Sequence, residues 1–171
     1  MKIELKKIKL NLEFSEETLM FKADIYIDGY HAGYCENDGH GACTNYHWLD
    51  QKGKDLIIKA QSHVELMPEK NYGDFKYKLK LHDYLDDLVH DHLKKKEQAK
   101  WDKKLNKMCQ TGIVLGNDIS YVHIKFTHPL ADLCRQCPGD VKKKIEDSLE
   151  KYKDRNFRLL NENIPFDVLT T

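Results

Sequence analysis

The sequence has no run of about 18 apolar residues, the length that a membrane-spanning helix needs. It also lacks the uninterrupted apolar stretch of a signal peptide near its start, because Met1–Lys7 alternates charged and apolar side chains. We therefore expect a soluble, cytoplasmic protein with no membrane partner.

An excess of charge of one sign is also missing. Lys plus Arg and Asp plus Glu both number 28, so no overall field draws the chain to polyanions. The lysine-rich segment 94–107 could contact phosphates, but Asp86, Asp87, Asp91 and Asp102 dilute its charge. We expect this segment to be a solvated helix face and do not expect a nucleic-acid partner, so any such binding must be local.

The strongest enzyme signatures are absent. No G-x-x-x-x-G-K-[ST], G-x-S-x-G or His-Glu-x-x-His motif occurs. Whether the protein is an enzyme therefore stays open at the level of motifs.

The five cysteines lack the dense, regular spacing of a secreted disulfide scaffold. Cys134-x-x-Cys137 resembles half of a zinc knuckle, in which two thiolates reach one ion across a tight turn. His128, Cys109 or His40 could complete the site if the fold brought them close. The alternatives are structural zinc at Cys134 and Cys137, or two unlinked buried cysteines at a helix end.

The first fifty residues carry the period-two pattern of β-strands. Segments 8–14 and 21–27 read as a hairpin, and the change of parity near Lys6–Lys7 predicts a β-bulge. Asp28–Gly29 predicts a type I′ turn into a third strand over 30–36. With a fourth strand within 42–48, the pattern predicts an antiparallel four-stranded meander.

Helical spacing takes over after residue 55. A helix is expected up to Pro68, and 69–80 reads as a loop or short strand. The apolar residues of 81–92 and 101–108 then form two stripes about half a turn apart, so one straight helix cannot bury both against one surface. We expect a solvated crossover or kink at 94–100 and a helix end at Thr111–Gly112.

The remaining residues predict a hairpin near 113–126, a helix capped by Asp140, and a last strand over 157–160. The predicted fold class is therefore α+β, with an N-terminal β-meander packed with about three helices and a further hairpin. A chain of 171 residues has the size of one domain, so we expect a single domain, β-rich over 1–50 and mostly helical over 51–171.

The loop between the third and fourth predicted strands is the most unusual stretch. If the loop closes symmetrically about Gly39, Cys35 faces Cys43 and His31 faces His47. One zinc ion could not bind all four, because at about 3.3 Å per residue His31 and Cys35 lie roughly 13 Å apart along a strand. The loop could instead offer backbone N–H groups as an anion nest, with His40 as donor or base, or it could be only a turn. The candidate contact residues are Asp38, His40, Cys43, Asn45 and His47.

Several segments together resemble small uncharacterised proteins of bacteria and their phages. These are the opening Met1–Lys9, the loop Asp38-Gly-His-Gly-Ala-Cys-Thr-Asn-Tyr46 and the ending Leu160-Asn-Glu-Asn-Ile-Pro165. The resemblance implies a standalone accessory protein, for which interference with a host or defence component is one reading. It implies no activity and no catalytic residues.

Two functions from different classes follow. The first is a non-enzymatic binding protein whose loop contacts a small anionic ligand or a partner protein. The alternative is a small hydrolase or transferase with His40 as base or Cys43 as nucleophile.

Overall fold

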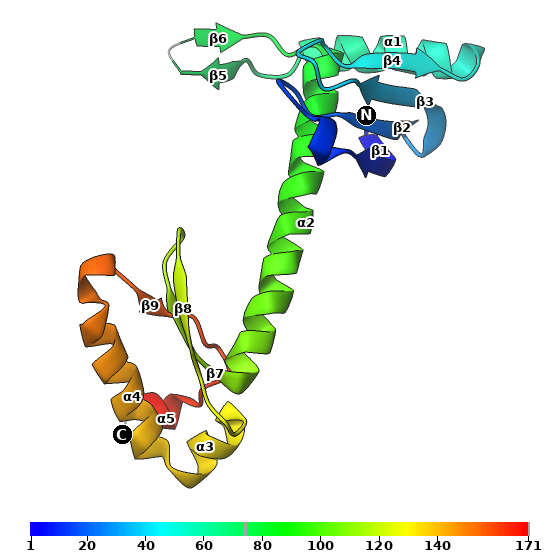
Figure 1. The fold of residues 1–171 in the computed structure, drawn as a ribbon. Coiled ribbons are helices and arrows are strands. Elements are labelled where there is room, and N and C mark those ends of the chain that lie inside the picture. Colours follow the sequence, from blue (N-terminus) through cyan, green and yellow to red (C-terminus); the bar gives the residue numbers. More distant parts are fainter. Residues whose placement is uncertain (74, 171) are drawn as a thin grey trace. The chain divides into compact units, whose positions relative to one another are not determined.

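The computed structural model describes residues 1–73 and 75–170 and has the predicted α+β fold (Figure 1). Contacts between residues group into two compact units, which we call unit 1, Met1–Lys95, and unit 2, from Lys96 onward. Each unit has its own cluster of buried hydrophobic side chains. Among the described residues, no helix is both long enough and apolar enough to cross a membrane.

Unit 1 is built on the predicted meander. Its four strands pair antiparallel in the order β1-β2-β3-β4, and their bounds are β1 Ile3–Leu10, β2 Phe21–Ile27, β3 Tyr30–Asn37 and β4 Asn45–Trp48. The predicted bulge is confirmed by a register shift between Lys6 and Lys9, with Lys7 at φ 51°. The predicted tight turn is confirmed too, since Asp28 and Gly29 have φ of 47° and 83°.

The first strand ends earlier than its alternation predicts. Strand β1 stops at Leu10, and a 3₁₀ turn, η1 Leu12–Phe14, follows with both of its apolar ends exposed. The Ser15 hydroxyl donates to Asn11 O and accepts from Met20 N, so a side chain satisfies backbone groups that a longer strand would pair.

Helix α1, Gln51–Glu65, packs on the sheet as the sequence predicts and ends before Pro68. It starts earlier than expected because Asp50 accepts a 2.7 Å hydrogen bond from Gly53 N as the N-cap. Gly53 lies so close to β3 that a Cβ would stand 2.2 Å from Ala32 O. A short hairpin follows, β5 Lys70–Tyr72 and β6 Phe75–Tyr77, in the segment read as a loop or short strand, while Asp74 lies outside the described residues.

Helix α2, Leu81–Thr111, contains both apolar stripes that the sequence shows. Leu81, Leu85 and Val89 are buried in the cluster of unit 1. Trp101, Leu105 and Met108 are half-buried in unit 2. The predicted change of face at 94–100 coincides with the boundary between Lys95 and Lys96. The segment is helical, the first stripe is buried in unit 1, and the second is half-buried in unit 2.

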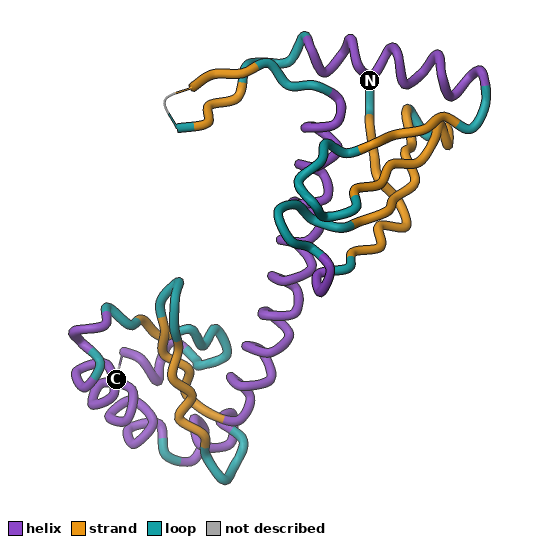
Figure 2. The backbone as a smooth tube through the Cα atoms, turned by 45° about the horizontal axis from the view of Figure 1, so that its top comes forward, coloured by secondary structure: helices purple, strands orange, loops and turns teal. Residues whose placement is uncertain are grey.

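Unit 2 contains the second predicted hairpin, β7 Gly112–Gly116 and β8 Tyr121–Lys125, with β9 Arg158–Leu159 on the other side of β7. Figure 2 shows this short sheet in orange beside purple helices. The helices are α3 Leu130–Gln136, α4 Pro138–Lys151 and α5 Phe166–Thr170, with a 3₁₀ turn, η2 Lys153–Arg155. The prediction that Asp140 caps α4 is wrong, because Pro138 already occupies the first turn and Cys137 is the N-cap.

Asn161 fixes the chain end of unit 2 onto β7. Its Oδ1 accepts from Val114 N at 2.7 Å and its Nδ2 donates to Gly112 O at 3.0 Å, so its buried amide acts like one more residue of a paired strand. Asn163 donates to Cys109 O in the last turn of α2. The Leu160–Pro165 ending is thus a structural element of unit 2.

Whether the two units form the expected single domain depends on whether they unfold together. Ile57→Ala leaves a cavity in unit 1, and Ile145→Ala leaves a matched cavity in unit 2. We expect each substitution to lower the opening free energy by about 2–5 kcal/mol in its own unit and to leave the other unchanged. Amide hydrogen exchange followed by mass spectrometry, with β2 and β7 as reporters, measures both. Equal losses in both units after either substitution would show one cooperative domain over 1–171.

Candidate functional site

The loop between β3 and β4 closes with a different register from the one expected. Glu36 pairs with Asn45, Cys35 with Tyr46 and Tyr34 with His47. The predicted pairing of Cys35 with Cys43 and of His31 with His47 is therefore wrong, because the loop centres between His40 and Gly41. As a result Cys35 is fully buried while Cys43 is exposed.

The side chain of Asn37 sets this closure. Its Oδ1 accepts from Thr18 Oγ1 at 2.8 Å and from Gly39 N at 2.9 Å. Its Nδ2 donates to Ala42 O at 2.9 Å and to Thr44 Oγ1 at 3.2 Å. Because this amide is 5% exposed, all four bonds are shielded from water and hold the loop in one shape.

The loop also locks onto the turn before β2. Gly39 O accepts from the backbone N–H groups of Glu16, Glu17 and Thr18 at 3.1 to 3.2 Å. Gly39 has φ 88° and a Cβ there would stand 2.6 Å from Phe14 O, so this position requires glycine. The N–H groups of Gly39, His40 and Gly41 bond to side chains of Asn37, Asp38 and Thr18, respectively. These three donors are therefore already engaged and do not form an open anion nest.

His40 and Cys43 do not form a nucleophile and base pair. His40 Nδ1 lies 3.2 Å from Glu16 Oε2, on an exposed part of the loop. Within the described part of the chain, no hydrogen bond joins Cys43 to any side chain. The other cysteine of this hairpin, Cys35, is unreactive because burial raises the pKa of its thiol to about 12.

A polar row crosses the solvent face of the sheet at its end. Lys9 pairs with Lys22, Lys22 with Glu36, and Glu36 with Asn45, one residue from each of the four strands. Beside this row lies a groove of about 600 Å³, which we call the sheet-end groove. Its lining residues are Lys9, Leu10, Asn11, Met20, Phe21, Lys22, Glu36, Asn37, Asp38 and Asn45.

The charges of the sheet-end groove are mixed. Lys22 Nζ lies 2.7 Å from Glu36 Oε2, and this bond raises the pKa of Lys22 so that it stays charged. Lys9 has no ion pair within the described residues, so its charge is free for a ligand. Lys9 and Lys22 directly opposite each other repel, and an anion between them would relieve this repulsion.

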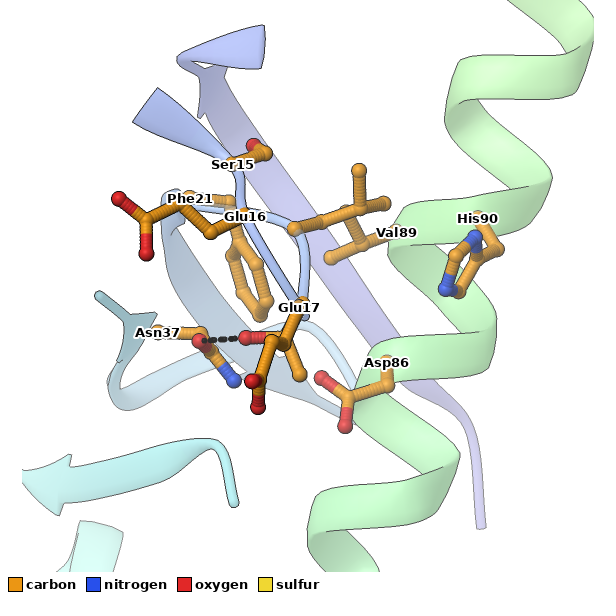
Figure 3. Close-up of a pocket in the computed structure, with 10 residues that line it drawn as sticks. Ser15, Glu16, Glu17, Phe21, Asn37, Asp86, Val89 and His90 are labelled. Atoms are coloured by element: carbon orange, nitrogen blue, oxygen red, sulfur yellow. Dashed lines mark hydrogen bonds between the residues drawn. The ribbon is translucent and has the colours of Figure 1, made fainter. Parts of the chain in front are cut away.

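A second concavity, which we call the acidic pocket, lies on the other side of Asn37. It has a volume of about 350 Å³ and is lined by Glu16, Glu17 and Asp86, together with Phe21, Val89 and His90. Figure 3 shows Glu17 from the turn before β2 and Asp86 from α2 on facing sides of this pocket. Three carboxyl groups disfavour an anion here.

Asp86 links α2 to the loop. The Thr44 hydroxyl donates a hydrogen bond to the Asp86 carboxyl. Burial is the main cause that raises the pKa of Asp86 above its ordinary value of 3.8, and the bond from Thr44 opposes the rise. Protonated Asp86 is therefore better tolerated in the folded protein than in the unfolded chain.

The structure gathers only part of the predicted contact set. Asp38 and Asn45 line the sheet-end groove, whereas His40, Cys43 and His47 do not. His47 stacks on Tyr34, with ring centroids 4.9 Å apart, one row away on the same sheet face. Lys9 and Lys22 were missed, although alternation places each on the polar side of its strand. Their pairing depends on the bulge and on the strand register, which residue types alone do not give.

The two cysteines of the C-x-x-C motif lie where α3 ends and α4 begins. Cys134 is 5% exposed. Burial is the main cause that raises the pKa of its thiol, and the charge of Cys137 adds to the rise. Among residues 1–73 and 75–170, no three His, Cys, Asp or Glu side chains are arranged to hold a metal ion. Cys109, one of the expected further ligands, instead has its Sγ 4.0 Å from Leu160 O. Zinc at Cys134 and Cys137 stays a prediction.

Compared with known proteins, the chain matches no protein-family model, and no curated protein or solved structure matches it significantly. The functional conclusion therefore depends on the geometry above.

The pKa shift of Asp86 makes stability depend on pH. Because the folded protein binds this proton more tightly, the contribution to stability is complete below pH 3.8 and is lost as the pH rises through the raised pKa. Asp86→Asn keeps an oxygen that accepts from Thr44 but cannot ionise. We expect its stability relative to the unsubstituted protein to increase from about pH 4 to about pH 8 in denaturant titrations.

Asp91→Asn is the matched control, since Asp91 is an exposed carboxylate on the same helix in unit 1. Its stability difference should stay flat over the same pH range. A flat difference for Asp86→Asn as well would contradict a buried carboxyl at this position.

Proposed function

We propose that the protein is a cytoplasmic, non-enzymatic binding protein whose sheet-end groove takes a small anionic ligand with an apolar body. The observation that carries this proposal is the row of Lys9, Lys22, Glu36 and Asn45 along one groove of about 600 Å³. A concave site of a few hundred cubic ångströms is typical for a small molecule.

Charge selects the ligand class. Glu36 already compensates Lys22, so the free charge next to the row belongs to Lys9. The amide group of Asn11, two residues further along the chain, adds a hydrogen-bond donor to the same groove. Asn45 on β4 lies three strand spacings, or about 14 Å, from Lys9 on β1. One carboxylate or phosphate group at Lys9, with the Asn11 amide as a further donor, matches this arrangement.

Apolar side chains select the rest of the ligand. Leu10 and Met20 are half-buried and Phe21 is 4% exposed, and all three line the same groove. An apolar ligand body packed on the exposed parts of Leu10 and Met20 would remove further apolar surface from water, whereas Phe21 is already buried in the core of unit 1. The groove thus suits an amphipathic anion better than a bare inorganic one.

The enzymatic alternative has no comparable support. His40 bonds to Glu16, Cys43 has no hydrogen-bonded base among the described residues, and neither lines the groove. The resemblance to phage and bacterial accessory proteins, and any role against a host component, stays a prediction.

Octanoate and octylammonium test the proposal, because they share a tail and differ in the sign of their charge. We expect octanoate to shift amide NMR signals of groove residues in a saturable way and octylammonium to leave them in place. Lys9→Gln should weaken octanoate binding about 10- to 150-fold, since a hydrogen bond to a charged group contributes about 1.5–3 kcal/mol.

Lys59→Gln is the matched control, because Lys59 is an exposed lysine of α1 in unit 1 outside the groove. Its affinity for octanoate should match that of the unsubstituted protein. Equal binding of both amphiphiles, or equal weakening by both lysine substitutions, would refute a site selective for anions at Lys9.

A further inference from the structure

The second half of α2 separates its charges by face. At about 100° per residue, Lys96, Lys100, Lys103, Lys104 and Lys107 fall within an arc of about 100°. All five side chains are exposed. We call this set the lysine stripe. Asp102, by the same geometry, lies on the opposite side of the helix, and Glu97 lies at the border of the stripe.

A pocket lies at the C-terminal end of the stripe. It has a volume of about 290 Å³, and its lining residues are Lys104, Lys107, Met108, Thr111, His123 and Lys125. Three lysines from α2 and β8 border one concavity that has no carboxylate in its lining, and its mostly apolar wall is formed by their side-chain stems and not by their ammonium groups. His123 Nε2 and Thr111 Oγ1 lie 3.4 Å apart within it.

These lysines lack internal partners. Among the described residues, none of Lys104, Lys107 and Lys125 forms an ion pair, and the one aromatic contact places Lys104 Nζ 5.1 Å from the Tyr121 ring centroid. Like charges on one face of a helix repel one another, so the arrangement favours a bound anion. The zero net charge of the whole chain conceals this local excess.

We propose that the lysine stripe and its terminal pocket bind the phosphate backbone of a nucleic-acid strand. From Lys96 to Lys107 the stripe extends about 16 Å at 1.5 Å per residue, which is longer than one phosphate group. A strand of nucleic acid supplies several phosphates over that length. Lysine is a point charge without the geometry to read bases, so the binding is independent of sequence.

This site lies wholly within unit 2 and is independent of the sheet-end groove. It also revises the expectation from composition that nucleic acid is not a partner. The aspartates that dilute the sequence segment are not in the lining of the lysine pocket, and Asp102 lies in a groove with Gln98, Trp101 and Leu105 instead.

Fluorescence anisotropy of a labelled oligothymidylate of about 16 nucleotides tests the proposal on the full chain. The triple variant Lys104→Gln, Lys107→Gln, Lys125→Gln should weaken binding about 10- to 100-fold and reduce the slope of log affinity against log salt by about 2. The variant Lys96→Gln, Lys100→Gln, Lys103→Gln, at the other end of the stripe, should also weaken binding.

Lys142→Gln, Lys143→Gln, Lys144→Gln on α4 is the control with the same loss of charge in the same unit. It should change the affinity less than about twofold, since salt largely screens the fields of exposed charges outside the site. Equal losses in the control would mean that net charge alone drives binding and would overturn the proposal. Inorganic phosphate or pyrophosphate binding that only the pocket variant abolishes, without oligonucleotide binding, would assign a single-phosphate site and would also overturn it.

Discussion

Helix α2 imposes the main constraint on this structure, because its two apolar stripes lie on different faces. A helix that is apolar on one face over residues 81–92 and on another over 101–108 must bury them against different partners. The four-stranded sheet and α1 cover the first stripe, and the β7–β8 hairpin meets the second through Trp101 and Tyr121. The boundary between the units falls in the segment where the apolar face changes.

Two buried asparagines, one in each unit, fix segments of the chain next to the apolar cores by hydrogen bonds. Asn37 satisfies four hydrogen bonds in the loop of unit 1, and Asn161 bridges β7 where β9 ends in unit 2. Asn37 is the last residue of β3 and Asn161 follows β9, so both lie where regular strand pairing ends and nearby backbone groups need other partners. The hydrogen bonds of Asn37 keep the loop closed, so its backbone N–H groups do not form an open anion nest. Asn37 and Asp38 of this segment also line the sheet-end groove. The Asn37 amide thus both fixes the shape of the loop and contributes to the candidate site.

Local patterns in the sequence predict much of the fold. The switch of apolar residues from odd to even positions near Lys6–Lys7 predicts the bulge, and Asp28–Gly29 predicts the turn. The apolar residues at helical spacing predict α1 and α2. The early end of β1 at Leu10, which depends on the hydrogen bonds of the Ser15 side chain, was not predictable in this way. The start of α4 at Pro138 was also misplaced, because Asp140 looks like a cap although the helix already begins before it. The short helices α3 and α5 were also missed, because a few residues carry too little periodicity.

The candidate site depends on register, which is why the sequence gives only part of it. Asp38 and Asn45 lie in the groove, but a shift of three residues in the β3–β4 pairing separates Cys43 from Cys35 and places His47 opposite Tyr34. Similarly, counting charges over 94–107 mixes two sides of a helix. Only winding the segment separates the lysine stripe from Asp102.

Two anion sites of different kinds, one in each unit, are the central claim. An amide-resolved NMR titration of the full chain, first with octanoate and then with oligothymidylate, tests it most directly. Octanoate should shift signals around Lys9, Lys22 and Asn45, the oligonucleotide should shift signals around Lys104, Lys107 and Lys125, and neither should displace the other. Shifts of one shared set of amides by both ligands would contradict two independent sites.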